Sequence, residues 1–146
     1  AASDVYKRQR KQMMEHHDDL RKLLLHEPRG YPCQNADFVL PPTRDDAAFG
    51  LVIAEQANIW PAMSGHNTIC VATALLETGM VPMTEREFAL DTPAGLVKIR
   101  AECANGRATS ITLENAPAYC RARDLDALLA APRRHPVPAS RTSVFL

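Results

Sequence analysis

Residues 63–80 read MSGHNTICVATALLETGM, and this stretch decides the fold. From Gly65 to Thr78 it has neither proline nor interior glycine, and its apolar residues spread around most of the circumference of a helix. Gly79 is suited to end this helix, and Pro82 prevents its continuation. A helix that is apolar nearly all round belongs inside a protein, so we expect it at the centre of the core.

Strands are predicted on both sides of this helix. Short apolar runs precede it at residues 38–40 and 49–55, and apolar and polar residues alternate in the later runs 87–91, 96–102 and 107–114. Asn105-Gly106 is a strong hairpin signal between the last two runs, and residues 92–95 (TPAG) make the preceding turn. The predicted fold class is therefore α+β (mixed α/β), with an antiparallel meander after the central helix.

The two ends of the chain differ from this middle part. Residues 1–25 are polar and helix-friendly, and the proline at 28 ends that segment. Residues 131–141 (APRRHPVPASR) are rich in proline and arginine without a pattern, which is typical of a disordered or linker-like segment. Trp60, the single tryptophan, is most simply a core anchor.

Composition excludes several classes of function. The 146 residues carry 17 Lys and Arg against 17 Asp and Glu, so no global basic field points to nucleic acid. No apolar run approaches the roughly 20 residues of a membrane span, and no signal-peptide core is visible, so a cytoplasmic protein is expected. The four cysteines lack zinc-site spacing, and we expect free, mostly buried thiols: Cys33, Cys70, Cys103 and Cys120.

The mouth of the central helix is the best candidate for chemistry. Ser64 stands at or beside the N-cap, and the unpaired N–H groups of a helix N-terminus can hold a carboxylate or phosphate. Gly65 would let such a ligand approach the backbone closely. Two structural interpretations stay open: Ser64 serves only as a cap, and His66 is only a hydrogen-bonding residue.

Other polar clusters have plain explanations beside functional ones. Residues 16–19 (HHDD) lack the spacing of a zinc protease motif and are typical of a solvated helix face. Residues 55–58 (EQAN) follow a buried strand, and they either line a cleft or form an ordinary strand end.

Four motifs together resemble the proline racemase family. They are HEPRG at 26–30, EQAN at 55–58, MSGHNT at 63–68 and DTPAG at 91–95, and the resemblance covers residues 13–123. The family includes proline racemases, 4-hydroxyproline 2-epimerases and trans-3-hydroxy-L-proline dehydratases. The resemblance implies one lobe of a two-lobed fold similar to diaminopimelate epimerase, in which a sheet wraps around a central apolar helix.

The resemblance also implies a chemistry without cofactor or metal. The substrate carboxylate would sit on the N-termini of the two central helices while acid and base groups on opposite faces exchange the Cα proton. Ser64 occupies the position of a catalytic Cys in many members, and Gly65, His66 and Asn67 correspond to substrate-contacting positions or lie beside them. Because a serine hydroxyl is a poor base at neutral pH, the departure at Ser64 favours hydroxyproline over plain proline.

The resemblance divides the chain into three parts. Residues 1–12 are expected to be a non-native leader, residues 13–125 an incomplete first lobe, and residues 126–146 a disordered or frameshifted tail. We expect the intact protein to act on hydroxyproline or proline as an epimerase, a racemase or a trans-3-hydroxy-L-proline dehydratase, with a homodimer as an option. The fragment itself is expected to be inactive, and a non-catalytic amino-acid-binding remnant is the further alternative.

Overall fold

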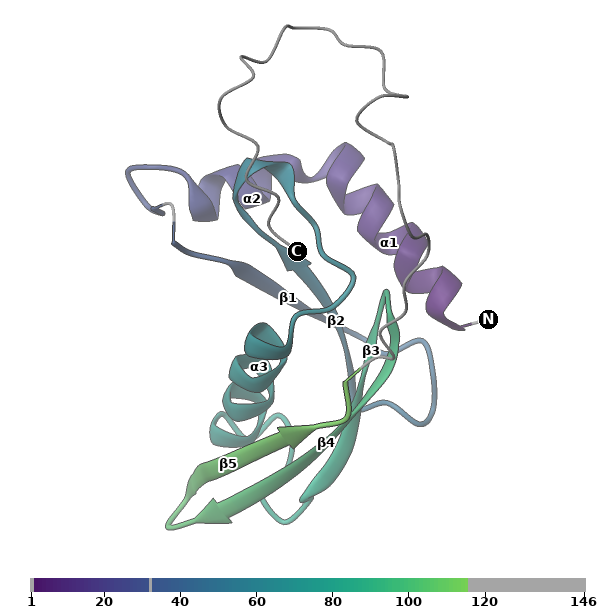
Figure 1. The fold of residues 1–146 in the computed structure, drawn as a ribbon, viewed down its shortest axis with the longest axis vertical. Coiled ribbons are helices and arrows are strands. Elements are labelled where there is room, and N and C mark those ends of the chain that lie inside the picture. Colours follow the sequence, from purple (N-terminus) through teal and green to yellow (C-terminus); the bar gives the residue numbers. More distant parts are fainter. Residues whose placement is uncertain (1, 32, 116–146) are drawn as a thin grey trace, which may run out of the picture.

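The computed structural model describes residues 2–31 and 33–115, and within these residues five strands form one sheet (Figure 1). The order β1-β2-β3-β4-β5 follows the chain. Only β2 and β3 are parallel, and α3 provides the connection that a parallel pair needs. The strands and this helix are β1 (Ala36–Leu40), β2 (Phe49–Ala54), α3 (Gly65–Glu77), β3 (Glu87–Thr92), β4 (Gly95–Ala104) and β5 (Arg107–Leu113).

The main core lies between α3 and one face of the sheet. The buried side chains of α3 meet apolar residues from β2, β3 and β4, and the cluster comprises Leu51, Ile53, Val71, Ala72, Leu75, Leu76, Val81, Leu90, Ile99 and Ala101. The helix ends where the sequence predicts, because Gly79 takes a left-handed φ of 76° directly after it.

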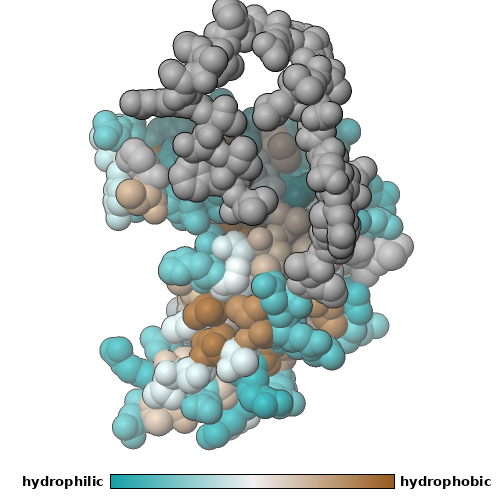
Figure 2. Space-filling model, in the orientation of Figure 1, coloured by the Kyte–Doolittle hydropathy of each residue, from teal (hydrophilic) through white to brown (hydrophobic). Residues whose placement is uncertain are grey.

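The expectation of a fully enclosed helix is wrong for one face of α3. Ile69 is 40% exposed, and Cys70 on the same face is also exposed. Figure 2 shows hydrophobic surface gathered over this part of the molecule. The reason is that the sheet covers only one side of α3, and the N-terminal helices pack elsewhere (Figure 1).

The N-terminal segment forms two helices, where the sequence suggested one continuous segment. They are α1 (Ala2–His16) and α2 (Asp18–Leu25), and His17 between them has a non-helical backbone with φ −132° and ψ 22°. Tyr6 of α1 packs with Val52, Ala54 and Trp60. Because Val52 and Ala54 alternate with the core residues of β2, α1 covers the face of the sheet opposite to α3. Trp60 is 5% exposed, so its prediction as a core anchor is confirmed.

The predicted strands agree with the observed ones to within two residues at each end. The antiparallel meander β3-β4-β5 is confirmed, and its second turn has the left-handed residues Asn105 (φ 53°) and Gly106 (φ 72°). A register shift interrupts the β4–β5 pairing between Glu102 and Cys103. The predicted tail at 126–146 lies outside the described residues, and the assignment of residues 1–12 as a leader stays a prediction.

The thiols are less buried than expected. Cys33, Cys70 and Cys103 are free, but the first two are exposed and the third is only partly buried. Cys33 precedes β1, and Cys70 lies on the open face of α3, which explains their exposure. Cys120 lies outside the described residues.

Candidate active site at the N-terminus of the central helix

Ser64 is the N-cap of α3. Its backbone is extended (φ −141°, ψ 123°), and its Oγ accepts a long hydrogen bond of 3.5 Å from the N–H of Asn67. The carbonyl oxygen of Ser64 accepts from the N–H of Thr68 at 2.9 Å and from its Oγ1 at 2.7 Å. The predicted cap is therefore confirmed, and these bonds fix the position at which the helix begins.

The space in front of Gly65 is open. Apart from its two chain neighbours and the backbone of its own helix, no described atom lies within 4 Å of the position that a Cβ on Gly65 would occupy, and its φ is not in the left-handed region. Neither packing nor backbone conformation within the described residues therefore requires glycine here. The N–H groups of Gly65 and His66 belong to the first helical turn and have no acceptor within the helix. The mouth of α3 is thus an accessible set of donors at the positive end of a helix dipole.

Asn67 is the structural centre of this site. Its side chain is buried, and residue 67 as a whole is 3% exposed. Its Oδ1 accepts from Ser64 Oγ at 3.1 Å and from Asn35 Nδ2 at 3.2 Å, while its Nδ2 donates to Asp37 Oδ1 at 2.9 Å. The amide that was expected near the substrate is thus engaged by protein groups and links α3 to the start of β1.

Asp37 is half-buried at this link. Its register partner in β2 is Ile53, a member of the core under α3, so Asp37 is on the face of the sheet that α3 covers. Burial raises the pKa of the Asp37 carboxyl, and the nearby charge of Glu55 adds to that effect. The hydrogen bond from Asn67 and the charge of His66 act in the opposite direction on this pKa.

His66 follows Gly65 in the first turn of α3. It is exposed, and its Nε2 lies 3.9 Å from the Sγ of Cys70, one turn further along the same face of α3. The predicted site residues therefore divide into two groups. Ser64 and Asn67 are directly bonded, and Gly65 and His66 border the open space at the helix mouth.

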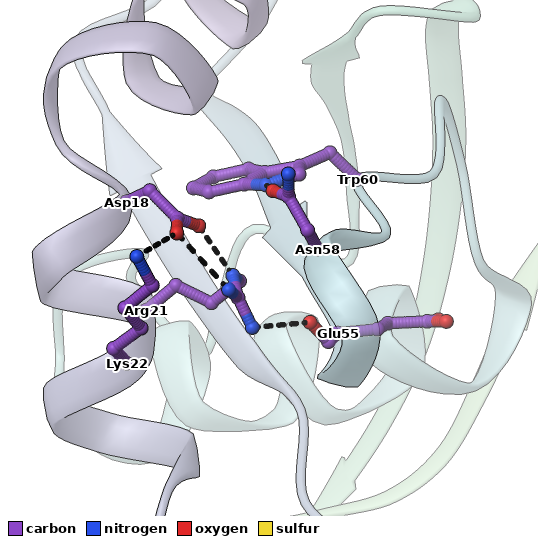
Figure 3. A network of polar contacts seen from close by, with 6 residues as sticks. All are labelled: Asp18, Arg21, Lys22, Glu55, Asn58 and Trp60. Carbon is purple, nitrogen blue, oxygen red and sulfur yellow. Dashed lines mark hydrogen bonds and ion pairs between the residues drawn. The ribbon is translucent and has the colours of Figure 1, made fainter.

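The segment between β2 and α3 is held in place by α2 (Figure 3). Arg21 is 3% exposed and forms two hydrogen bonds to the carboxylate of Asp18, at 2.5 and 3.1 Å. Its third contact is a donation of 3.4 Å to the carbonyl of Glu55. Trp60 Nε1 donates to Asn58 Oδ1 at 3.0 Å, and Asn58 has a left-handed φ of 59°. The sequence suggested that residues 16–19 form a solvated helix face. For Asp18 this is wrong, because its carboxylate is bonded to the buried Arg21.

The four motifs that carry the family resemblance meet around this segment. Gln56 Nε2 donates to the carbonyls of Leu25 and of Tyr31, the latter at 3.2 Å, which joins residues 55–58 to both sides of residues 26–30. The N–H of Ala94, in the turn between β3 and β4, donates to the carbonyl of Ala62 at 3.2 Å. Residues far apart in the sequence thus converge on the segment that leads into Ser64.

Two cavities among the described residues lie away from the predicted site residues. One of about 560 Å³ is lined mainly by residues of β3, β4 and β5, and the other of about 440 Å³ by Leu25, His26, Glu27, Tyr31 and Gln56. The helix mouth is an open surface. Within residues 2–31 and 33–115, no cluster of His, Cys, Asp or Glu is placed to hold a metal, and no helix is long and apolar enough to cross a membrane.

Sequence reasoning did not find Asp37 or Asn35. Both fell in a stretch with turn chemistry, ahead of a short predicted strand. One feature of the sequence could have indicated Asp37. It stands next to Phe38 at the start of that strand, and alternation along a strand places one of these two side chains towards the core. Pairing it with Asn67, 30 residues away, required the register of β1 against β2.

Curated relatives align with most of this chain, and the aligned part is about a third of each relative's own length. A 4-hydroxyproline 2-epimerase of Streptosporangium roseum is 43% identical over 109 residues, which are 73% of this chain and 32% of that protein. Proteins of Marinobacter nauticus and Chromohalobacter salexigens are 43% and 44% identical, and they are covered to 33% and 30%.

Solved structures give the same result for the fold. A hydroxyproline epimerase from Agrobacterium vitis, with bound trans-4-hydroxy-L-proline, matches with 44% identity and a TM-score of 0.61, over 66% of this chain and 28% of that one. A probable proline racemase from Agrobacterium radiobacter, with bound carbonate, matches with 43% identity, the same TM-score and the same coverage. The family model for proline racemase matches residues 2–131. These matches and the converging motifs lead to one conclusion: the chain belongs to the proline racemase family.

Proposed function

We propose that the intact protein is a cofactor-independent hydroxyproline 2-epimerase and that the mouth of α3 holds the substrate carboxylate. The observation that carries this proposal is the open space at Gly65 beside the capping residue Ser64. The relatives named as hydroxyproline epimerases support the substrate class, and one of them was solved with trans-4-hydroxy-L-proline bound. The present chain spans about a third of the curated relatives, so the activity belongs to the longer protein.

The proposed reaction exchanges the proton at Cα in two transfers. A base on one face of the substrate removes the Cα proton, the carboxylate shares the resulting negative charge, and an acid on the opposite face returns a proton to Cα. The N–H groups of Gly65 and His66 and the helix dipole stabilise the carboxylate as its charge grows. A thiol with a free pKa of about 8.5 is a better base at neutral pH than a serine hydroxyl, so the base must lie elsewhere.

We assign Ser64 to the opposite face, as the group that returns the proton or assists it. This assignment requires a second lobe with its own acid or base group. The chain spans about a third of the curated relatives, and we therefore expect the 146-residue chain by itself to be inactive. A cytoplasmic location and a homodimer of the intact protein stay predictions.

The second candidate is a trans-3-hydroxy-L-proline dehydratase. Its first step is the same removal of the Cα proton, and the 3-hydroxyl then leaves as water with a proton from the enzyme. The hydroxyl of Ser64, in place of a thiol, favours this candidate because a hydroxyl can assist the leaving group without competing as a base. A non-catalytic amino-acid-binding protein is the remaining alternative, and it needs only the helix mouth.

The test is a product assay with the intact protein in D₂O. With trans-4-hydroxy-L-proline, the epimerase predicts the C2 epimer with deuterium at Cα; with trans-3-hydroxy-L-proline, the dehydratase predicts loss of water. Calorimetric binding of either compound without a product would support the binding protein. Neither binding nor product with either compound would contradict the proposal as a whole.

A further inference from the structure

The buried amide of Asn67 has a partner at each end. Its Nδ2 donates to Asp37 Oδ1 at 2.9 Å, and its Oδ1 accepts from Ser64 Oγ at 3.1 Å and from Asn35 Nδ2 at 3.2 Å. Asn67 is 3% exposed, so protein groups provide its hydrogen bonds. A single side chain therefore connects the carboxylate of Asp37 with the hydroxyl of Ser64.

The chemistry of these groups determines the direction of each hydrogen bond. An ionised carboxylate only accepts hydrogen bonds, so Asp37 requires the NH₂ end of the Asn67 amide to face it. The carbonyl end of the amide then faces Ser64. Since a carbonyl oxygen has no hydrogen to give, the hydroxyl of Ser64 must be the donor in that contact.

We propose that Asp37 is a positioning residue: through Asn67 it directs the hydroxyl hydrogen of Ser64 into the protein and leaves an oxygen lone pair of Ser64 facing the mouth of α3. The inference rests on the proposed function only in assuming that the substrate binds at this mouth. The role proposed for Ser64 is more than that of a helix cap. A cap needs only the contact between the Asn67 N–H and Ser64 Oγ, which is long at 3.5 Å. It also gives Asn67 a positioning role in place of a substrate contact.

The proposal has a consequence for the role of Ser64. In this arrangement the hydroxyl accepts hydrogen bonds only from a ligand group that carries a hydrogen, and not from the substrate carboxylate. To give its hydrogen to a substrate, either the hydroxyl must rotate away from Asn67 or the Asn67 amide must turn over. Asp37 opposes the second movement, because a turned amide would place its carbonyl oxygen against the carboxylate.

A thiol introduced at position 64 makes this constraint measurable. In a Ser64→Cys variant of this chain, the thiolate form would face the carbonyl oxygen of Asn67, which disfavours negative charge. If Asp37 is replaced by Asn, the residue 37 side chain can pair with either end of the Asn67 amide. The amide is then free to turn and donate its NH₂ to the thiolate, which lowers the thiol pKa.

The experiment measures the pH dependence of alkylation at position 64 by peptide-resolved mass spectrometry. This resolution separates the signal from the exposed thiols of Cys33 and Cys70. We expect Asp37→Asn, added to Ser64→Cys, to lower the pKa of the introduced thiol by about one unit, the effect of one hydrogen bond to a charged group. Asp37→Glu keeps a group that only accepts, and it should keep the thiol pKa near that of the parent.

Glu55→Gln is the matched control. Glu55 is the other carboxylate whose charge acts on Asp37. Glu55→Gln removes one negative charge without touching Asn67, so it measures the effect of the electric field alone. An equal shift in Asp37→Asn and Glu55→Gln, no shift, or an upward shift in Asp37→Asn would overturn the proposal. Because alkylation involves no turnover, these outcomes are independent of whether the intact protein is an epimerase.

Discussion

The hydroxyl of Tyr6 occupies the space that a side chain on Gly50 would need: a Cβ on Gly50 would lie 1.3 Å from Tyr6 Oη. Tyr6 is fully buried in α1, and its hydroxyl donates to the carbonyl of Pro41 at 2.8 Å. Burial, with the charge of Asp91 as a second cause, raises the pKa of Tyr6 to about 12. Tyr6 thus attaches α1 to β2 by packing and to the end of β1 by a hydrogen bond.

The substitution Gly50→Ala should therefore detach or displace α1. We expect it to lower the free energy of unfolding of this chain by about 1–3 kcal/mol, the usual cost of overpacking, as measured by denaturant titration. In a Tyr6→Ala background the same substitution should cost much less, because the clash is gone. Equal costs in both backgrounds would show that Tyr6 does not pack on Gly50.

Deletion of residues 1–12 tests the same contact from the side of the predicted leader. These residues include Tyr6, which covers Val52, Ala54 and Trp60. We expect the deletion to lower the melting temperature, because it exposes these apolar side chains to water. An unchanged melting temperature would mean that α1 contributes nothing to the stability of the sheet.

Gly65→Ala should have opposite effects on stability and on binding. Because the space in front of Gly65 is open, the substitution should raise the free energy of unfolding of this chain by about 0.5 kcal/mol, the gain from a better helix former. In the intact protein the added methyl group should weaken hydroxyproline binding, as measured by calorimetry. Gly30→Ala is the contrasting control, since its Cβ would meet the backbone of Leu25 at 2.3 Å and should destabilise the chain. A loss of stability with Gly65→Ala would contradict the open site.

Two carboxylates should give pH dependences of opposite sign. The hydrogen bond from Arg21 lowers the pKa of Asp18 to about 2, from an ordinary value of 3.8. Between pH 3.8 and about 2 the unfolded chain therefore binds more protons than the folded chain. The stabilisation that Asp18 contributes is present above pH 3.8 and is lost as the pH falls towards 2. The difference in unfolding free energy between the parent and Asp18→Asn should shrink over that range. For Asp19→Asn, at the exposed neighbouring position, the difference in unfolding free energy from the parent should stay constant over that range.

Asp37 should behave in the opposite way. Its pKa is raised by burial, so the folded chain holds a proton more tightly than the unfolded chain. Stability should fall as the pH rises from 3.8 through the raised pKa, since the half-buried carboxylate becomes charged. Unfolding titrations of Asp37→Asn should lack this decrease. A parent chain that becomes more stable than Asp37→Asn over the same interval would show that the hydrogen bond from Asn67 outweighs burial.

Local signals explain which features were predictable from the sequence. The cap at Ser64, the left-handed Gly79 and the Asn105-Gly106 turn each depend on a few adjacent residues, and the structure has all three. The meander was predictable from alternation for the same reason. Ser64 was a good candidate because a helix N-terminus and a family motif coincide there.

The remaining features depend on distant contacts. The bond from Asn67 to Asp37 and that from Arg21 to Glu55 join residues 30 and 34 positions apart, and no local pattern encodes them. The exposed face of α3 was missed because composition shows that a helix is apolar without showing how much of it the sheet covers. The exposure of Cys70 follows from the same open face.

The central claim is that Ser64 at the mouth of α3 serves one face of Cα in the intact protein. The most direct measurement is deuterium incorporation at Cα in D₂O, starting separately from each C2 epimer of 4-hydroxyproline, for the parent, for Ser64→Ala and for the exposed control Ser110→Ala. The account predicts that Ser64→Ala slows incorporation by about 100-fold or more from one epimer, the usual contribution of an acid–base group, while Ser110→Ala has no effect. Unchanged incorporation from both epimers in Ser64→Ala would contradict the account.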